Sequence, residues 1–252
     1  MAMNENAAEF YTRQDDVFGR IASRYDLLCD LFSLGIHRLW KQRVAQVIAQ
    51  EPWSVLLDCA TGTGEIILRV LDLKTISEEQ KIIASDISPQ MLAVAQKRLP
   101  AEKAFIEFAV LDAHSLPEVP TESIDIYSIS LGLKICKRKD VLHEAMRVLR
   151  PGGRLVVLEA SNIPLRWLQR AYLLYMNLCM PVIGWIATKG DSSAYKYLLN
   201  GIEKFPSAEE FAQELRTIGF RDVAFQRLTL GIVAIHTARK PRTKESDLHR
   251  MA

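Results

Sequence analysis

The segment Asp58-Cys-Ala-Thr-Gly-Thr-Gly64 joins a short apolar run, residues 54–58, to an apolar helical pattern that begins at Ile66. We expect the run to be a buried strand and the pattern to be a helix that starts directly after the small-residue turn. Such a turn allows a ligand to approach the backbone, and a helix N-terminus favours negative charge. The segment therefore predicts a strand–turn–helix unit that binds a ligand at the carboxyl end of its strand.

The alternation of strand and helix continues along the chain. A helix is expected after Ser88, which suits an N-cap, with Pro89 at its first position. A turn is expected at Pro151-Gly-Gly153. Further strands are expected at 81–85, 105–111, 124–131 and 154–159, further helices at 139–149 and 208–218, and a closing antiparallel pair at 223–228 and 232–237. This order predicts an α/β fold with a doubly wound, mostly parallel, seven-stranded sheet.

Residues 17–240 are expected to form one domain, with flexible ends at 1–16 and 241–252. An amphipathic helix is expected at 36–48, with Lys41 among the residues outside its apolar stripe. The fold is also expected to have an N-terminal helical lid that carries Tyr25. The apolar stretch at about 163–190 interrupts the alternation and is expected to be a helical insertion after the fifth strand. Because that stretch contains Arg170 and Pro181, we expect it to be buried or interfacial rather than membrane-spanning.

The composition excludes several classes of protein. Of 252 residues, 49% are apolar and 25% are charged, which excludes a wholly disordered chain. A net charge of +2 gives no indication of a nucleic-acid binder. The cysteines, at Cys29, Cys59, Cys136 and Cys179, form no CxxC pair, and the N-terminus does not resemble a secretory signal. We therefore expect a cytoplasmic protein with free thiols and no metal site.

The residues around the turn indicate which cofactor it binds. Asp86 ends the second strand, where an acid can accept hydrogen bonds from both hydroxyls of a ribose. The dinucleotide fingerprint needs a small residue where this chain has Ile67, and no Walker A lysine is present. The pattern Asp-x-(Gly/Ala)-x-Gly-x-Gly is instead typical of S-adenosylmethionine-dependent methyltransferases. Together with Asp112-Ala113 at the end of the third strand, it predicts S-adenosylmethionine as the cofactor.

Longer segments resemble one family, the UbiE-type C-methyltransferases of ubiquinone and menaquinone biosynthesis. The most specific are Val17-Phe-Gly-Arg-Ile-Ala-Ser-Arg-Tyr-Asp26, Phe32-Ser-Leu-Gly-Ile-His-Arg-Leu-Trp-Lys41 and Gly231-Ile-Val-Ala-Ile-His236. The segment Arg147-Val-Leu-Arg-Pro-Gly-Gly-Arg-Leu155 is common to many methyltransferases. The resemblance covers nearly the whole chain. It implies the Rossmann-like fold of class I methyltransferases and transfer of a methyl group to a quinol ring.

The resemblance also implies cofactor contacts. Thr63 and neighbouring amides would hold the amino-acid part, Asp86 the ribose, and the pair Asp112-Ala113 the adenine. Ser130, at the end of the fourth strand, would lie beside the sulfonium and is counted with the catalytic residues. The remaining expected contacts are Tyr25 from the lid, Asp58, Ala60 and Gly62 in the turn, and Ile87 and Met91 around the adenine, with a core role left open for Met91.

The sequence also departs from the family pattern. It has Leu131-Gly-Leu-Lys-Ile135 where the family commonly has Phe-Gly-Leu-Arg-Asn. Lys134 therefore replaces an arginine thought to assist catalysis, and we expect it to stabilise a phenolate, the alternative being a solvated loop lysine. His37, His114 and His236 are alternative bases, although a loop role suits His114 and a structural role suits His236.

The expected acceptor is a prenylated quinol. Leu173, Leu174 and Met176 in the insertion can form an apolar wall for its tail, and the alternatives are a packed helix or a homodimer contact. Such a substrate implies peripheral contact with the inner face of a membrane. Because the acceptor loop has changed, methylation of another small molecule stays open as an alternative function. A non-catalytic cofactor-binding subunit of a biosynthetic complex is a further alternative, and the intact Thr63, Asp86, Asp112 and Ser130 weigh against it.

Overall fold

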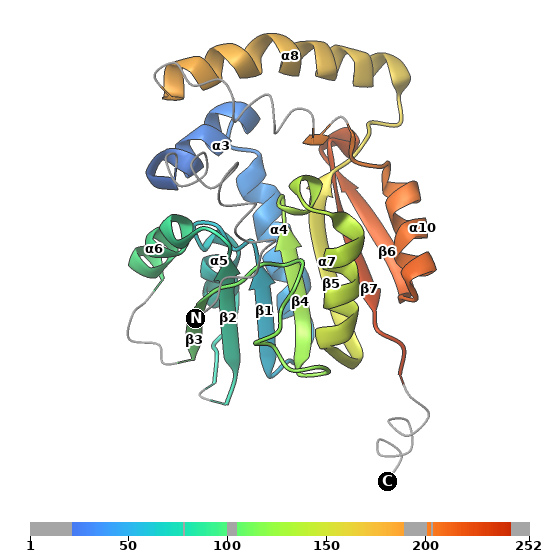
Figure 1. Ribbon diagram of the computed structural model, residues 1–252. Helices are drawn as coiled ribbons and strands as arrows, with labels where there is room; N and C mark the ends of the chain where they lie inside the picture. The colour runs from blue at the N-terminus through green and yellow to red at the C-terminus, as the bar shows by residue number, and fades with distance from the viewer. Residues whose placement is uncertain (1–21, 78, 100–104, 189–200, 203, 243–252) are drawn as a thin grey trace.

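The computed structural model describes residues 22–77, 79–99, 105–188, 201–202 and 204–242, built around one seven-stranded sheet (Figure 1). The strand order is β3-β2-β1-β4-β5-β7-β6. The strands from β3 to β5 pair in parallel, and β5, β7 and β6 pair in antiparallel fashion. The expected doubly wound, mostly parallel sheet with a closing antiparallel pair is therefore confirmed. The flexible ends expected at 1–16 and 241–252 lie outside the described residues, except for residues 241 and 242.

The elements follow the expected order along the chain. The strands are β1 (Val55–Cys59), β2 (Lys81–Asp86), β3 (Ile106–Val110), β4 (Ile124–Ser130), β5 (Leu149–Ala160), β6 (Arg221–Leu228) and β7 (Val233–Arg239). The helices are α3 (Tyr25–Ser33), α4 (His37–Ala49), α5 (Glu65–Leu73), α6 (Pro89–Arg98), α7 (Arg138–Val148), α8 (Arg166–Thr188) and α10 (Ala208–Ile218). Three short 3-10 segments are η2 (Ala22–Arg24), η3 (Leu133–Ile135) and η4 (Thr229–Gly231).

The expected turn at 151–153 is wrong. Strand β5 already begins at Leu149, which pairs with Ile124, and the register shifts before Arg154 pairs with Ile126. Gly152 and Gly153 also exchange backbone hydrogen bonds with Lys240, directly after β7. The Pro-Gly-Gly segment is therefore an irregular part of strand β5, because backbone groups on both sides, in β4 and directly after β7, pair with this part of the strand.

Adjacent residues on the central strands point to opposite faces of the sheet and make two apolar layers. Leu56 and Ile126 contribute to the cluster that contains side chains of α4 and α5. Leu57 and Tyr127 contribute to the cluster that contains side chains of α7 and α10. Figure 1 shows these two helix pairs on opposite sides of the sheet. Burial on both faces explains why these strands are almost wholly apolar.

Local signals set the helix ends. The Ser88 side chain accepts a hydrogen bond from the Met91 amide, and Pro89 opens α6, which confirms the expected start. Ser207 and Glu210 form a capping box at the start of α10, and Gly219 ends that helix in a left-handed conformation.

The insertion forms α8, which crosses the carboxyl edge of the parallel strands above α3 (Figure 1). Met176 is buried, whereas Trp167, Leu174 and Leu178 are exposed. In the described part of the chain, the helices are too short or too polar to cross a membrane.

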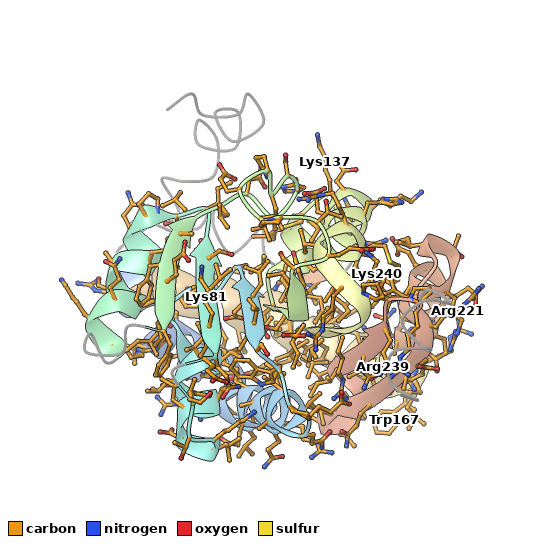
Figure 2. The ribbon with its side chains drawn as sticks, turned by 90° about the horizontal axis from the view of Figure 1, so that it is seen from below. Lys81, Lys137, Trp167, Arg221, Arg239 and Lys240 are labelled. Atoms are coloured by element: carbon orange, nitrogen blue, oxygen red, sulfur yellow. The ribbon has the colours of Figure 1, made fainter. Side chains whose placement is uncertain are left out.

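The opposite edge of the sheet carries basic side chains with acidic partners. Figure 2 views this edge and labels Lys81 at the start of β2, together with Arg239 and Lys240 at the end of β7. Lys81 pairs with Glu107, Arg239 with Glu51, and Lys240 with Glu122. These three basic side chains are therefore compensated by acidic neighbours.

The first prediction concerns Gly64, which begins α5 with φ +77°. An added Cβ would lie 3.1 Å from Leu99 Cδ1 and 3.2 Å from Ala95 Cβ. We expect Gly64→Ala to lower the free energy of unfolding by about 2–4 kcal/mol, combining the left-handed cost with crowding. Urea denaturation measures the change.

Gly35 provides a matched control, because it has the same φ of +77° and its nearest neighbour to an added Cβ is 4.0 Å away. Gly35→Ala is expected to lower the free energy of unfolding by only about 1–2 kcal/mol, the cost of placing a residue with a Cβ in a left-handed conformation. Equal losses of unfolding free energy in the two variants would show that the close packing of Gly64 against α6 does not contribute to the effect.

Candidate functional site

A buried carboxylate holds the glycine-rich turn from below. Asp58 is 1% exposed and accepts hydrogen bonds from Thr61 Oγ1 at 2.6 Å and from Ser128 Oγ at 2.5 Å. Burial raises the pKa of Asp58 to about 6. Above the carboxylate, Ala60 and Gly62 adopt left-handed conformations with φ 50° and 58°. Asp58 therefore anchors the buried side of the turn through hydrogen bonds to Thr61 and Ser128.

A cavity opens beside the turn, at the carboxyl edge of β1, β2 and β4. It contains most of the residues expected to bind the cofactor: Tyr25, Ala60, Gly62, Asp86, Ile87, Met91, Asp112, Ala113 and Ser130. Asp58 and Thr63 are the two expected contacts that do not line it. Nine of the eleven residues expected to contact the cofactor thus share one cavity wall, and Thr63 lines a smaller cavity next to it.

Asp86 is fixed by the backbone around it. Its Oδ2 accepts a hydrogen bond from the Gly62 amide at 2.8 Å, and its Oδ1 accepts one from the Ser88 amide at 2.9 Å. These bonds join the turn after β1 to the end of β2. Because the carboxylate stays in the cavity wall, it can also accept hydrogen bonds from a diol.

Two observations test whether the cavity suits S-adenosylmethionine. An added Cβ at Gly62 would meet no atom within 4 Å, so the turn faces open space. Ser130 Oγ is buried and has no hydrogen-bond partner among the described residues. Buried polar atoms are normally paired, so this hydroxyl suits a polar ligand atom. Met91 and Ile87 add an apolar wall, and the residues fit an adenosine-containing group.

Asp112 is positioned by His114. The His114 ring accepts the Lys137 amide on Nε2 at 2.9 Å, so its proton lies on Nδ1 and is donated to Asp112 Oδ1 at 2.5 Å. His114 and its hydrogen bonds hold the pKa of Asp112 below its usual range, against the effect of burial. Both ring nitrogens are therefore committed, and His114 has the structural loop role rather than that of a base.

The Thr63 hydroxyl has two partners within the protein. Its hydroxyl donates to Asp26 Oδ1 at 2.7 Å and accepts from Arg98 at 3.0 Å, and Arg98 also pairs with Asp26. Asp26 belongs to α3 and Arg98 to α6. Thr63 thus ties the N-terminal helix to the glycine-rich turn instead of offering its hydroxyl to a ligand.

A second cavity of about 290 Å³ lies on the other side of Tyr25 and Leu131, which line both cavities. Its walls come from the end of α3, the start of α4, the loop after β4, and α8. Apolar and aromatic side chains dominate the lining, among them Phe32, Ile36, Trp40, Tyr172, Tyr175, Met176 and Val233. The arrangement suits an aromatic ligand beside the first cavity.

Lys134 contributes a charge to this apolar cavity. Its side chain is 7% exposed, and Nζ lies 3.3 Å from Glu159 Oε1, so the alternative of a solvated loop lysine is wrong. Nζ also donates to the carbonyl oxygen of Leu131, a residue with φ 58°. Lys134 therefore steadies the strained wall between the two cavities, and an ammonium has a third proton to donate.

His37 also lines the second cavity and is 2% exposed. Ser33 Oγ donates its single proton to the Cys29 carbonyl at 2.7 Å, so it accepts from His37 Nδ1 at 2.8 Å. The Nε2 atom then carries the lone pair, and within the described chain it has no hydrogen-bond partner. The ring is thus oriented by Ser33, and its unpartnered Nε2 lies 3.7 Å from Glu65 Oε2.

His236 is remote from both cavities. Its Nε2 donates to the Ala208 carbonyl at 2.9 Å, and Phe211 and Phe225 pack against the ring. Burial lowers the pKa of His236 to about 4. These contacts confirm the structural role and remove His236 from the candidate bases.

Sequence reasoning missed two charged residues, Lys41 and Glu65. Lys41 was expected outside the apolar stripe of its helix, but it is 7% exposed and pairs with Glu65, which is 8% exposed. The sequence did show an acidic residue, Glu65, directly after the glycine-rich turn. Lys41 lies 24 residues earlier, so only the folded chain brings the two side chains together.

Solved structures support the fold. The CurJ carbon methyltransferase superposes with a TM-score of 0.58 at 20% identity, covering 80% of this chain and 54% of that one. A SAM-dependent methyltransferase from Thermotoga maritima, titled as a possible histamine N-methyltransferase, gives 0.60 at 18% identity, covering 89% and 98%. At such identities the likeness concerns the fold alone, and it confirms the Rossmann-like class I methyltransferase architecture.

Sequence relatives are much closer. A Dinoroseobacter shibae protein named ubiquinone/menaquinone biosynthesis C-methyltransferase UbiE is 40% identical over 238 residues, covering 90% of this chain and 93% of the relative. The protein of that name from Paracoccus denitrificans is 41% identical over 227 residues, covering 89% of each. A family model described as the ubiE/COQ5 methyltransferase family matches residues 6–240. This chain therefore belongs to the ubiE/COQ5 methyltransferase family.

Proposed function

We propose that the protein transfers a methyl group from S-adenosylmethionine to a ring carbon of a quinol, in ubiquinone or menaquinone biosynthesis. The observation that carries the proposal is the shared wall: Tyr25 and Leu131 line both the polar cavity beside the glycine-rich turn and the apolar cavity next to it. The names of relatives about 40% identical agree with this chemistry. Two ligands bound on either side of that wall would be close enough to react.

The cofactor would be held by the first cavity. Asp86 would accept the ribose hydroxyls, the Asp112-Ala113 pair would contact the adenine, and Ile87 with Met91 would pack on its faces. Ser130 would supply its unpaired hydroxyl from the wall of the first cavity, next to Leu131, which lines both cavities. When bound, the cofactor supplies an electrophilic methyl group on a cationic sulfur. The protein supplies orientation, because displacement at the methyl group needs close and collinear atoms.

The polar groups of the second cavity suit a ring with two hydroxyls. Lys134 and Glu159 lie on the side of the η3 loop and β5, whereas Ser33 and His37 lie at the junction of α3 and α4. The remaining wall is mostly apolar and aromatic. A quinol has one hydroxyl at each end of an apolar ring, so its two polar ends match these two polar positions.

The proton is proposed to move to His37. The O–H bond of one ring hydroxyl breaks, its proton goes to His37 Nε2, and the electron pair stays on the oxygen and makes the ring carbon nucleophilic. Asp30 Oδ1 and Glu65 Oε2, each 3.7 Å from a ring nitrogen, would stabilise the imidazolium that results. After the ring carbon gains the methyl group, its C–H bond breaks and the proton passes to water, while the imidazolium of His37 returns its proton to the ring oxygen and aromaticity is restored.

Lys134 is proposed to bind the second oxygen or the developing phenolate through its third proton. Its ion pair with Glu159 keeps the ammonium in place and offsets part of its charge. Lysine here acts as a point donor, in contrast to the planar guanidinium of an arginine. The acceptor loop thus retains a cation although its sequence differs from the common family pattern.

A membrane contact is proposed for α8. Trp167, Leu174 and Leu178 recur on one exposed face of the helix, and Arg166 and Arg170 are exposed beside them. An apolar face with basic neighbours suits the surface of an anionic membrane. Tyr172, Tyr175 and Met176 of the same helix line the second cavity, so a prenyl tail could pass from the membrane to the ring site.

The central assay uses labelled S-adenosylmethionine with demethylmenaquinol and with a ubiquinol precursor that lacks the ring methyl group. We expect transfer to at least one of them, because both present a hydroxylated ring to the second cavity. Scintillation counting after extraction of the lipid measures the transfer.

The oxidised quinones are the matched controls, since they have no hydroxyl proton to lose and are expected to accept no methyl group.

The same transfer assay tests the membrane contact of α8. Trp167→Asp is expected to slow transfer to a long-tailed quinol in anionic vesicles and to leave transfer to a short-tailed quinol in solution unaffected. Cofactor binding without transfer to either quinol would contradict the proposal and leave another small molecule as the acceptor.

A separate experiment concerns His37. The variant His37→Gln is expected to lower kcat about 100- to 10,000-fold, because it removes the proton acceptor. Added imidazole is expected to restore part of the activity of His37→Ala. His143→Gln is the control, since His143 is an exposed residue of α7. An unchanged kcat, or equal weakening of cofactor binding, would exclude this role.

A further inference from the structure

A small cavity lies between the glycine-rich turn and the N-terminal helices. Tyr25, Gly62, Thr63 and Ser130 line it together with Lys41 and Glu65. Tyr25, Gly62 and Ser130 also line the proposed cofactor cavity, so the small cavity is an extension of it. Lys41 is the last residue of the Phe32–Lys41 segment, and Glu65 is the first residue of α5.

Lys41 and Glu65 form a buried ion pair at this position. The Lys41 ammonium donates to Glu65 Oε2, and Arg69 donates to Glu65 Oε1 at 3.0 Å. A buried ion pair adds little to the stability of a fold, because the free energy needed to remove two charges from water is about as large as the free energy gained from their attraction. Two ionised groups in a cavity wall beside a cofactor site therefore suggest that they bind part of a ligand.

The cofactor has one end that matches such a pair. Its amino-acid end carries a carboxylate and an ammonium group on the same carbon, so it needs a cation and an anion close together. The residue expected for this end, Thr63, has its hydroxyl committed to Asp26 and Arg98. The start of α5, where Glu65 lies, also presents backbone amides that favour a carboxylate.

We propose that Lys41 and Glu65 form the subsite for the amino-acid end of S-adenosylmethionine, with Lys41 binding the α-carboxylate and Glu65 the α-ammonium. This inference rests on the proposed use of that cofactor. The ion pair and the contact with Arg69 hold both side chains in place before the ligand arrives, and the ligand then brings a carboxylate to Lys41 and an ammonium to Glu65. Tyr25 covers the boundary between this subsite and the rest of the cavity.

Two probes separate this subsite from the remainder of the cofactor site. S-adenosylhomocysteine carries the amino-acid end, whereas 5′-methylthioadenosine lacks it and keeps the adenosine and the sulfur. We expect Lys41→Met to weaken binding of S-adenosylhomocysteine about 10- to 100-fold, the loss of one charge-assisted hydrogen bond. Binding of 5′-methylthioadenosine should stay within about twofold. Isothermal titration calorimetry measures both affinities.

Matched variants keep the test falsifiable if Lys41→Met folds poorly. Lys41→Arg retains the charge and is expected to keep most of the affinity for S-adenosylhomocysteine. Glu65→Gln is expected to weaken binding of S-adenosylhomocysteine without weakening binding of 5′-methylthioadenosine. Lys81→Met removes a lysine from the exposed Lys81–Glu107 pair and is expected to change neither affinity.

Two results would overturn the inference: unchanged affinity for S-adenosylhomocysteine in Lys41→Met and Glu65→Gln, or an equal loss for both probes. Neither probe contains a methyl acceptor, so the outcome does not depend on whether a quinol is the substrate. Failure of the unaltered protein to bind either probe would overturn both this inference and the proposed cofactor. Failure of quinol methylation alone would leave this subsite standing.

Discussion

The geometry of the site depends on two carboxylates that fix one turn. Asp58 holds the turn from the interior through Thr61 and Ser128, and Asp86 holds it from the neighbouring strand through the Gly62 amide. Buried charged acceptors form strong hydrogen bonds and are costly to leave unpaired, so the turn has little freedom. With the turn fixed, α5 starts at Glu65, the polar cavity opens beside Gly62, and β4 ends with Ser130 in the same wall.

The N-terminal helices complete the site because they are attached to that same turn. Asp26 reaches Thr63 and Arg98, and Lys41 reaches Glu65. These contacts place Tyr25 between the polar and the apolar cavity and bring His37 to the far wall of the second one. Helix α8 then covers the carboxyl edge of the sheet (Figure 1). A methyl donor and an apolar acceptor can thus be held on two sides of one thin wall.

Much of this arrangement could be predicted from local patterns. The strands, the start of α6 at Pro89 and the position of Asp86 follow from short apolar runs, a cap and spacing, all of which act over a few residues. Long-range contacts could not be predicted. The Lys41–Glu65 pair, the bonding of Thr63 to Asp26 and the pairing of Leu149 with Ile124 each join segments that only the folded chain brings together. The resemblance supplied residue roles but not the partners that occupy their side chains.

The central claim is that the methyl group reaches a carbon of a quinol ring. The most direct measurement uses S-adenosylmethionine labelled with ¹³C in the methyl group and locates the label in the purified product by NMR. We expect a methyl signal that correlates with the aromatic ring carbons, as for a methyl group bonded to carbon. A label on a ring oxygen would contradict C-methylation of the quinol, and so would a product in which the quinol carries no label.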